Sequence, residues 1–299
     1  MKQNGIIKVK GNQRLAAFIL AAATAANLQA QAFTISVHDA QFTKPVIERL
    51  VEEYSRLNPD FHAEVVKAAQ EQTDANVTLN ADTKGSEATV GRFVVLPVAN
   101  EHSQLLAVKK VQRGLSDKLE KQLFVQPDVE EEILANDDGV KQLPGTVYSL
   151  TGRKAVTTQV LARQLKTSPS RLRGKRIMGR EENLLDVVRT TDDAVSYNVA
   201  NLIYDVNSRH PLTGIAVLPV DLDGNGKVSD QEREAVNNLD TLTEFIGAHP
   251  AEKAPVGNVD IITDKPQLKE FVNWTRTQGH RILAQYGLLA AERQLALAE

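Results

Sequence analysis

Phe33-Thr-Ile-Ser-Val37 alternates apolar and polar residues, which predicts a β-strand. A short loop, His38-Asp-Ala-Gln-Phe42, separates this strand from a helical segment that begins at Thr43, a predicted N-cap, with Pro45 in its first turn. Asn58-Pro59 ends the helix, because the residue before a proline disfavours helical geometry. The apolar face of the helix consists of Val46, Leu50, Val51, Tyr54 and Leu57. The stretch therefore predicts a strand, a loop and a helix in succession.

Similar elements follow along the chain. Strands are predicted at residues 61–66, 76–79, 93–98, 146–148, 195–198 and 214–220. Helices are predicted over most of 101–138, from Thr157 onward, at 184–190, and from Glu232 to the C-terminus. Trp274 lies at helical spacing with other apolar residues and is expected in the core. Alternating strands and helices predict an α/β fold with parallel strands.

The first 32 residues have the three parts of a secretory signal peptide. Four basic residues and no acidic one precede or border an apolar run from Leu15 to Leu28, and Ala30-Gln31-Ala32 follows it. A membrane-spanning helix needs about 20 apolar residues, so this run is too short for an anchor. We expect cleavage after Ala32 and a periplasmic, exported protein.

The composition excludes several classes of protein. With 42% hydrophobic and 24% charged residues, the chain is neither disordered nor fibrous. It contains no cysteine, which excludes disulfides, thiolate metal sites and thiol nucleophiles. It also has no Gly-x-Ser-x-Gly motif and no metalloprotease helix, so we do not expect an enzyme.

Residues 139–180 carry ten basic residues and no acidic one, directly after an acidic run from Asp128 to Asp138. The basic stretch lacks the interleaving of basic and aromatic residues that base stacking needs, so a nucleic-acid partner is not expected. Two interpretations stay open for it, a solvated basic face and an electrostatic funnel for an anionic ligand.

Asp221-Leu-Asp-Gly-Asn-Gly-Lys-Val-Ser-Asp-Gln-Glu232 matches the twelve-residue calcium loop. Calcium takes six to eight oxygen ligands, and the loop offers them from alternate residues around the sharp turn that Gly226 permits. The predicted ligands are Asp221, Asp223, Asn225, the carbonyl of Lys227, and both oxygens of Glu232, with Ser229 positioned to hold a water. A second interpretation, which can hold at the same time, is an Asp-Gly turn followed by a capping box of Ser229 and Glu232. Because a strand and not a helix precedes the loop, we expect structural calcium and no opening switch.

The order of elements also resembles a known family. The resemblance is carried by residues 35–59, with their Tyr54-x-x-x-Asn58-Pro59 ending, and by residues 93–100, 145–152, 195–205 and 214–220. In these stretches the sequence is similar to periplasmic substrate-binding proteins of ABC transporters, in the branch of the phosphate-binding proteins.

This resemblance implies an α/β fold of two lobes (type II), each a mixed sheet flanked by helices, with the EF-hand-like calcium loop added. The implied boundaries are a signal peptide at 1–32, lobe 1 at 33–91, lobe 2 at 92–205, and a return to lobe 1 at 206–299. The implied function is capture of a small anionic ligand, with phosphate the first candidate, for an ABC permease in the inner membrane, by a monomer.

In such a protein the ligand lies between the lobes, at loops that precede helices, where free N–H groups favour anions. The predicted ligand-binding residues are Gln41, Phe42, Thr43, Asn80, Asp82, Ser149, Thr151, Gly152, Arg153, Lys154, Tyr197 and Asn198. A different function also stays open, that of a secreted calcium-binding interaction protein that kept the fold without a role in transport.

Overall fold

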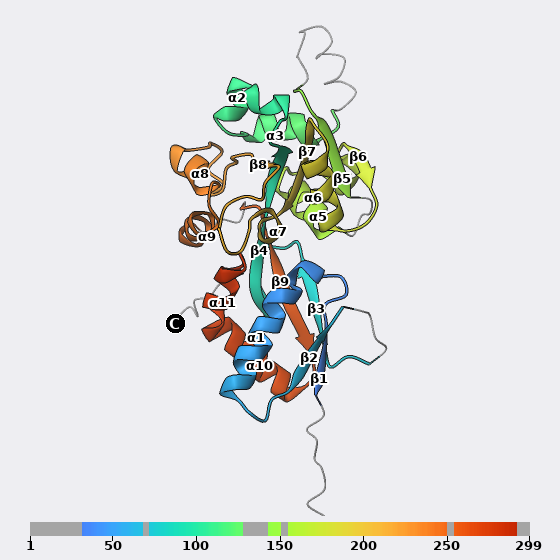
Figure 1. Cartoon of the computed structure of the whole chain (residues 1–299), viewed down its shortest axis with the longest axis vertical. Coiled ribbons are helices and arrows are strands. Elements are labelled where there is room, and N and C mark those ends of the chain that lie inside the picture. Colours follow the sequence, from blue (N-terminus) through green and yellow to red (C-terminus); the bar gives the residue numbers. More distant parts are fainter. Residues whose placement is uncertain (1–31, 68–71, 128–142, 151–154, 250–253, 292–299) are drawn as a thin grey trace, which may run out of the picture. The chain divides into compact units, whose positions relative to one another are not determined.

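The computed structural model describes residues 32–67, 72–127, 143–150, 155–249 and 254–291 (Figure 1). The predicted signal peptide up to residue 31, the acidic run 128–138 and the predicted ligand-binding residues 151–154 lie outside these ranges. Among the described residues, no helix combines the length and hydrophobicity needed to cross a membrane.

Six strands form what we name the first sheet. They are β1 (Phe33–Ser36), β2 (Ala63–Val66), β3 (Ala75–Asn80), β9 (Val256–Thr263), β10 (Leu289–Ala290) and the beginning of β4 (Thr89–Asn100). β1 pairs in parallel with β2 and with β3, whereas β9 runs antiparallel to both β3 and β4. The parallel part was predicted from the alternation of strands and helices in the sequence.

The second sheet contains the rest of β4 together with β5 (Thr146–Leu150), β6 (Lys175–Ile177), β7 (Ala194–Val199) and β8 (Ile215–Val217). β5 is parallel to both β6 and β7, and β4 pairs antiparallel with β7 and β8. Because β5, β6 and β7 run in the same direction, the loops that follow them meet at one edge of this sheet.

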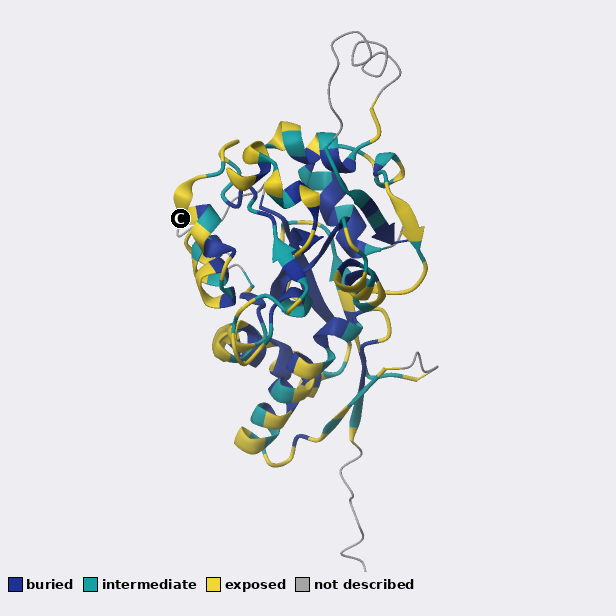
Figure 2. Ribbon diagram, turned by 45° about the horizontal axis from the view of Figure 1, so that its top comes forward, coloured by how far each residue is buried: buried dark blue, intermediate teal, exposed yellow. Residues whose placement is uncertain are grey.

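β4 belongs to both sheets. Its residues up to Val94 pair with β9, and those from Val95 onward pair with β7. All twelve residues of the strand are buried (Figure 2), as expected for a strand covered on both faces. The amide of Val95 donates a 2.7 Å hydrogen bond to the carbonyl of Pro255. The segment that leads into β9 therefore lies beside β4 at the point where β4 passes from the first sheet to the second.

Helices α1 (Lys44–Leu57), α10 (Pro266–Gln278) and α11 (His280–Gln285) pack around the first sheet. Tyr54 of α1 meets the rings of Phe61, Phe271 and Trp274, which confirms Trp274 as a core residue. Thr43 is the N-cap residue of α1, as predicted, although its hydroxyl makes no capping bond and donates 2.6 Å back to the carbonyl of Ala40. One detail of the predicted helix was wrong, because Leu57 is 57% exposed.

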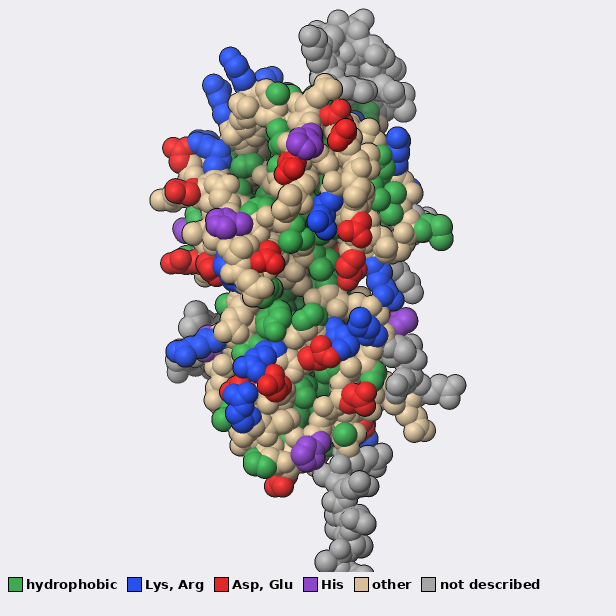
Figure 3. Space-filling view, in the orientation of Figure 1, with side chains coloured by type: hydrophobic (Ala, Val, Ile, Leu, Met, Phe, Trp, Pro, Cys, Tyr) green, Lys and Arg blue, Asp and Glu red, His purple; other side chains and the backbone are tan. Residues whose placement is uncertain are grey.

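The second sheet is accompanied by α5 (Val156–Gln164), α6 (Glu181–Thr190) and the short α7 (Ala200–Ile203). The remaining short helices of the described ranges are η1 (Gln41–Thr43), η2 (Gln104–Ala107), α2 (Lys109–Gln112), α3 (Asp117–Phe124), η3 (Pro169–Arg171), α8 (Asp230–Ala235) and α9 (Leu239–Ala248). In Figure 3, Lys and Arg side chains gather near α2, whereas acidic and basic groups are interspersed elsewhere on that face.

The sequence-based prediction missed three strands, β6, β9 and β10. It placed only helices after Glu232, yet β9 lies there and pairs with both β3 and β4. It also placed the return to the first lobe at residue 206. In the structure β8, which lies beyond residue 206, pairs with Val98–Asn100 in the second sheet, and β9 is the strand that re-enters the first sheet.

Candidate functional site

Two sheet edges supply the loops of the candidate site. β1 and β3 are parallel, so the loop after β1 and the connection after β3 leave the first sheet at the same edge. In open α/β sheets, ligands bind outside such carboxyl ends of strands. The structure connects the loop after β1 with residues that follow β6 and β7 of the second sheet.

The loop after β1 holds the predicted residues Gln41, Phe42 and Thr43, and only Gln41 presents its side chain to the other sheet. Its amide Nε2 donates 3.1 Å to the carbonyl of Lys67, and its Oε1 accepts from a guanidinium Nη1 of Arg180. The carbonyl of Phe42 accepts a 3.0 Å bond from Nδ2 of Asn201. The side chains of Phe42 and Thr43 are buried, so they support the loop from inside.

The second predicted loop begins at Ser149, which is fully buried at the end of β5. Its hydroxyl accepts a 3.1 Å bond from Nη1 of Arg176. Thr151, Gly152, Arg153 and Lys154 lie outside the described residues, and α5 begins shortly after them at Val156. The N-terminus of α5 offers backbone N–H groups and the positive end of its dipole to an anion.

A carboxyl group of the protein itself lies at this helix N-terminus. Thr157, in the first turn of α5, donates a 3.3 Å bond from its hydroxyl to Oε1 of Glu181. Burial raises the pKa of Glu181, and the charge of Glu182 adds to the effect, while Arg180 opposes it. The ionisation of Glu181 therefore sets how much negative charge the site already holds.

Tyr197 and Asn198 were predicted to line the cleft, but both side chains are buried within the second sheet. The Tyr197 hydroxyl lies 2.9 Å from the hydroxyl of Thr158, and burial raises its pKa to about 12. Asn198 donates 2.8 Å from Nδ2 to the carbonyl of Glu181. Both residues thus hold α5 and α6 in place beneath the loops.

Asn80 ends β3 and Asp82 follows it, and the two residues have different surroundings. Asn80 accepts the amide of Asp82 at 2.9 Å, and Asn258 of β9 donates 3.0 Å to the carbonyl of Asp82. These bonds fix the backbone and leave the Asp82 carboxylate exposed at a groove of about 370 Å³. The polar residues that line this groove are Asp82, Gln159, Arg163 and Thr167.

Sequence reasoning missed Arg180, Glu181 and Asn201. Arg180 and Glu181 follow β6, a strand of only three residues whose exposed basic side chains gave no apolar signal. Gly179, with φ +119°, marks the turn between β6 and α6, and it was the sequence signal that could have located this loop. Asn201 lies within a stretch that carried the family resemblance, but no role was assigned to it.

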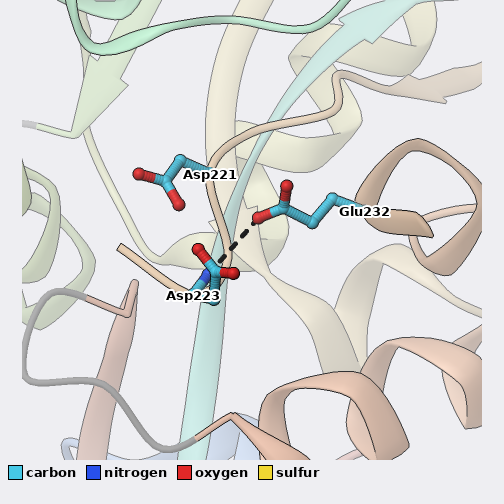
Figure 4. Close-up of side chains that lie close together, drawn as sticks. All are labelled: Asp221, Asp223 and Glu232. Carbon is cyan, nitrogen blue, oxygen red and sulfur yellow. Dashed lines mark hydrogen bonds between the residues drawn. The ribbon is translucent and has the colours of Figure 1, made fainter. Parts of the chain in front are cut away.

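The predicted calcium loop brings three carboxylates together. One carboxylate oxygen from each of Asp221, Asp223 and Glu232 lies within 4.8 Å of the others, and the side chains point toward a common space (Figure 4). Asp221 and Glu232 are buried. Burial raises the pKa of Asp221, an effect that the charge of Glu232 increases. Such a buried group of acids suits a hard cation that takes oxygen ligands.

The backbone of the loop is organised by the same side chains. Asp221 Oδ2 accepts the amide of Gly226 at 2.6 Å, and Gly226 has φ +89°, as its predicted role in the sharp turn requires. Glu232 Oε1 accepts the amide of Leu222 at 2.6 Å, and its Oε2 accepts the amide of Ser229 at 2.6 Å. The predicted capping box of Ser229 and Glu232 is confirmed, and so is the strand, β8, that precedes the loop. Each carboxylate oxygen keeps acceptor capacity beyond these bonds, so the donor set fits calcium.

Comparison with known proteins places the fold. No protein-family model matches the sequence, and no curated protein matches it either. The structure is similar to a protein from Clostridium perfringens named as a phosphate ABC transporter substrate-binding protein, solved with bound phosphate. The two share 12% sequence identity at a TM-score of 0.53, over 87% of this chain and 100% of the other.

A second similar structure is an ABC-type phosphate transport receptor from Vibrio cholerae. It shares 11% identity at a TM-score of 0.51, over 86% of this chain and 99% of the other. At such identities the likeness concerns the fold. This chain therefore has the mixed α/β fold that substrate-binding proteins of ABC transporters also have.

Proposed function

We propose that this protein is an extracytoplasmic solute-binding protein that captures a small ligand for an ABC importer, with an oxyanion such as phosphate as the first candidate. The observation that carries the proposal is the contact between the two sheet edges. Arg180 reaches Gln41, and Asn201 reaches the carbonyl of Phe42. A ligand held between these loops stabilises whichever arrangement of the sheets gives it the most contacts.

The chemistry of the loops suits an anion. The N-terminus of α5 offers backbone donors, and Arg180 adds a guanidinium group that binds oxyanions through paired N–H bonds. Arg153 and Lys154 lie in the same connection between β5 and α5, and we assign them to the site together with Ser149, Thr151 and Gly152. The ionised carboxylate of Glu181 would repel an oxyanion. The site therefore favours an oxyanion most when Glu181 is protonated.

The proposed location is the periplasm, after cleavage of the signal peptide at Ala32. Release of the ligand requires a membrane partner, which we propose is an ABC permease in the inner membrane. We propose that the protein acts as a monomer, without nucleic acid and without catalysis.

We also propose that the loop from Asp221 to Glu232 binds calcium and that this calcium is structural. Asp221, Asp223, Asn225, the carbonyl of Lys227 and Glu232 would hold the ion. Burial raises the pKa of Asp221, and the charge of Glu232 adds to the effect. The positive charge of the ion would favour the ionised carboxylates. Val220, directly before the loop, forms a β-bridge with Leu115, which lies between α2 and α3, so an ordered loop stabilises this region.

The alternative, a secreted calcium-binding interaction protein without a transported ligand, is distinguished by a thermal melting screen. The full chain is melted with phosphate, sulfate, molybdate and organic acids, each with calcium or with a chelator. A solute-binding protein is stabilised by its ligand through RT ln(1 + [L]/Kd). A rise in melting temperature with a solute supports transport, whereas a response to calcium alone supports the alternative.

A further inference from the structure

The predicted calcium loop contains a pair of residues, Asn225 and Gly226, whose covalent chemistry the proposed function does not use. An asparagine followed by glycine is especially prone to deamidation, because glycine has no Cβ to hinder the attack of its amide nitrogen on the asparagine side chain. The other Asn-Gly pair of the sequence, Asn4-Gly5, lies in the predicted signal peptide. Asn225-Gly226 is therefore the Asn-Gly pair of the mature sequence.

The reaction needs only this pair and water. The amide nitrogen of Gly226 gives up its proton and bonds to Cγ of Asn225, the bond from Cγ to Nδ2 breaks, and ammonia leaves with that proton. Water then opens the cyclic imide at either of its two carbonyl groups. Opening at Cγ leaves aspartate. Opening at the main-chain carbonyl leaves isoaspartate, in which the peptide chain runs through Cβ.

The pair is open to solvent. Asn225, Gly226 and Lys227 are all exposed. A Cβ placed on Gly226 would meet no described atom within 4 Å apart from those of its chain neighbours. The described part of the chain therefore sets no steric barrier to the imide ring or to the water that opens it.

The hydrogen bonds that the described residues make to the reacting groups come from the loop itself. The amide of Gly226 donates to Oδ2 of Asp221 at 2.6 Å. Nδ2 of Asn225 donates to Oδ2 of Asp223 at 2.8 Å, and Oδ1 of Asn225 accepts the amide of Lys227 at 2.9 Å. Ring closure must break the first of these bonds, because the nitrogen has to turn toward Cγ. The reactivity of the pair therefore depends on how firmly Asp221 is held.

The carboxylates that restrain this pair are also the proposed calcium ligands. Oxygens of Asp221, Asp223 and Glu232 lie within 4.8 Å of one another (Figure 4), and like charges at such a separation repel each other. A cation among them offsets this repulsion and holds Asp221 on the amide of Gly226. Asn225 is itself a proposed ligand. Calcium therefore keeps the reacting atoms apart, whereas the calcium-free loop opens more often.

We propose that Asn225 is a deamidation site of the calcium-free protein and that bound calcium protects it. Isoaspartate lengthens the main chain by one carbon atom inside the turn, which displaces the ligands on either side and ends calcium binding. Ammonia is lost to water, so the reaction does not reverse and the loop records how long the chain has been without calcium. The protection rests on the proposed calcium site, whereas the reactivity of the pair does not.

The test is incubation of the full chain at neutral pH in calcium or in chelator, followed by peptide mass spectrometry and enzymatic methylation of isoaspartate. Asn207 is the internal control, because it is exposed and precedes Ser208, whose amide donates 2.7 Å to Oδ1 of Asp205. The attacking nitrogen there has a similar carboxylate partner. It belongs to a residue with a Cβ, and Asp205 is not part of the three-carboxylate group.

In chelator, Asn225 should deamidate about tenfold faster than Asn207, which corresponds to about 1.4 kcal/mol in activation free energy. Calcium should slow the reaction at Asn225 by about the same factor and leave the rate at Asn207 unchanged. Asn225→Gln should remove the isoaspartate signal from this peptide, because its longer side chain closes the ring far more slowly. Equal rates at Asn225 and Asn207 in chelator, or an intact Asn225, overturn the proposal.

Melting of the same samples separates this proposal from that of the calcium site. Stabilisation by calcium without deamidation of Asn225 in chelator overturns the deamidation site and leaves the calcium site standing. Deamidation at one rate in both conditions, without stabilisation by calcium, overturns the protection and the calcium site together. Deamidation at one rate in both conditions despite stabilisation by calcium overturns the protection alone.

Discussion

Nδ2 of Asn201 donates a 3.0 Å hydrogen bond to the carbonyl oxygen of Phe42, and the two residues follow strands of different sheets. Asn201 lies in α7, directly after β7, whereas Phe42 lies in η1, after β1. The bond joins the loop after β1 of the first sheet to the start of α7, after β7 of the second sheet. From the sequence, only the family resemblance predicted that these two segments meet. A ligand site between the sheets therefore depends on these loops and on the side chains that connect them.

Arg180→Ala should weaken phosphate binding. Its guanidinium meets Gln41 from the opposite sheet, and a hydrogen bond to a charged group contributes about 1.5–3 kcal/mol, equivalent to at least a tenfold change in affinity. Calorimetric titration with phosphate measures the effect. Lys175→Ala, a change of an exposed cation on the neighbouring strand β6, serves as the control and should leave the affinity within twofold. Equal affinities of the native chain and Arg180→Ala would remove Arg180 from the site.

Glu181→Gln should bind phosphate more tightly than the native chain, and more so at high pH. Burial raises the pKa of Glu181, so the group stays protonated over a wider pH range and becomes a repelling anion only as pH rises through that pKa. The ratio of the variant's affinity to the native affinity should therefore increase from pH 5.5 to pH 8.5. Using this ratio cancels the ionisation of phosphate itself. Asp186→Asn, which changes an exposed acid farther along α6, is the matched control, and a ratio for Glu181→Gln that does not change with pH contradicts the assignment.

Removing calcium should lower the melting temperature of the full chain. A ligand present at 100 times its Kd stabilises a protein by about 2.7 kcal/mol, and a chelator abolishes that contribution. Asp221→Asn should eliminate the difference between calcium and chelator. Asp230→Asn, which changes an acid just outside the three-carboxylate group, should preserve it. The structural-calcium proposal fails if the native chain melts at the same temperature in both conditions.

Glu120→Gln should make the protein more stable at alkaline pH. This glutamate of α3 is buried, and desolvation raises its pKa to about 8. Since the pKa is higher in the folded than in the unfolded chain, the folded state binds the proton more tightly. Its contribution to the free energy of unfolding is complete below the unfolded pKa near 4.5 and is lost as pH rises to about 8.

The loss has a maximal slope of about 1.4 kcal/mol per pH unit. Urea unfolding of the native chain and Glu120→Gln at pH 5, 7 and 9 gives the two free energies of unfolding. Their difference should grow with pH in favour of the variant. Lys118→Gln, on the exposed side of the same helix, is the control, and a pH-independent difference for Glu120→Gln would show that the carboxyl is not protonated in the folded chain.

The first strand, loop and helix were predictable because their periodicity was strong and local. Val46, Leu50, Val51 and Tyr54 recur at helical spacing, and all four are buried. Leu57 shares that spacing but is exposed, because it occupies the last helical position before Asn58. Periodicity thus identified the buried face and overestimated its length by one residue.

β9 was missed for a physical reason. It is buried on both faces, so its sequence lacks the alternation of a half-exposed strand, and it includes Gly257, Asn258 and Asp260. Glycine is required at 257 because a Cβ there would lie 2.3 Å from Cζ of Phe93. The polar residues that weaken the strand signal have partners far away in sequence, such as the Thr89 hydroxyl, which donates 2.6 Å to Asp260. Such pairs become visible only in the folded chain.

The candidate site was predictable where a motif specified it and only partly elsewhere. The motif from Asp221 to Glu232 defined the residues of that loop, and its capping box was predicted from Ser229 and Glu232. The other predicted ligand-binding residues could be chosen only by knowing which loops meet. Arg180 and Glu181 belong to the loop after β6, a strand that was not predicted from the sequence. Tyr197 and Asn198 were predicted as ligand-binding residues, but in β7 both side chains are buried.

The central claim is that the protein captures a small solute, and equilibrium titration of the full chain with phosphate tests it most directly. The account predicts saturable binding of one phosphate per chain that Arg180→Ala weakens at least tenfold. Absence of binding to phosphate, and to sulfate, molybdate and organic acids under the same conditions, would contradict it.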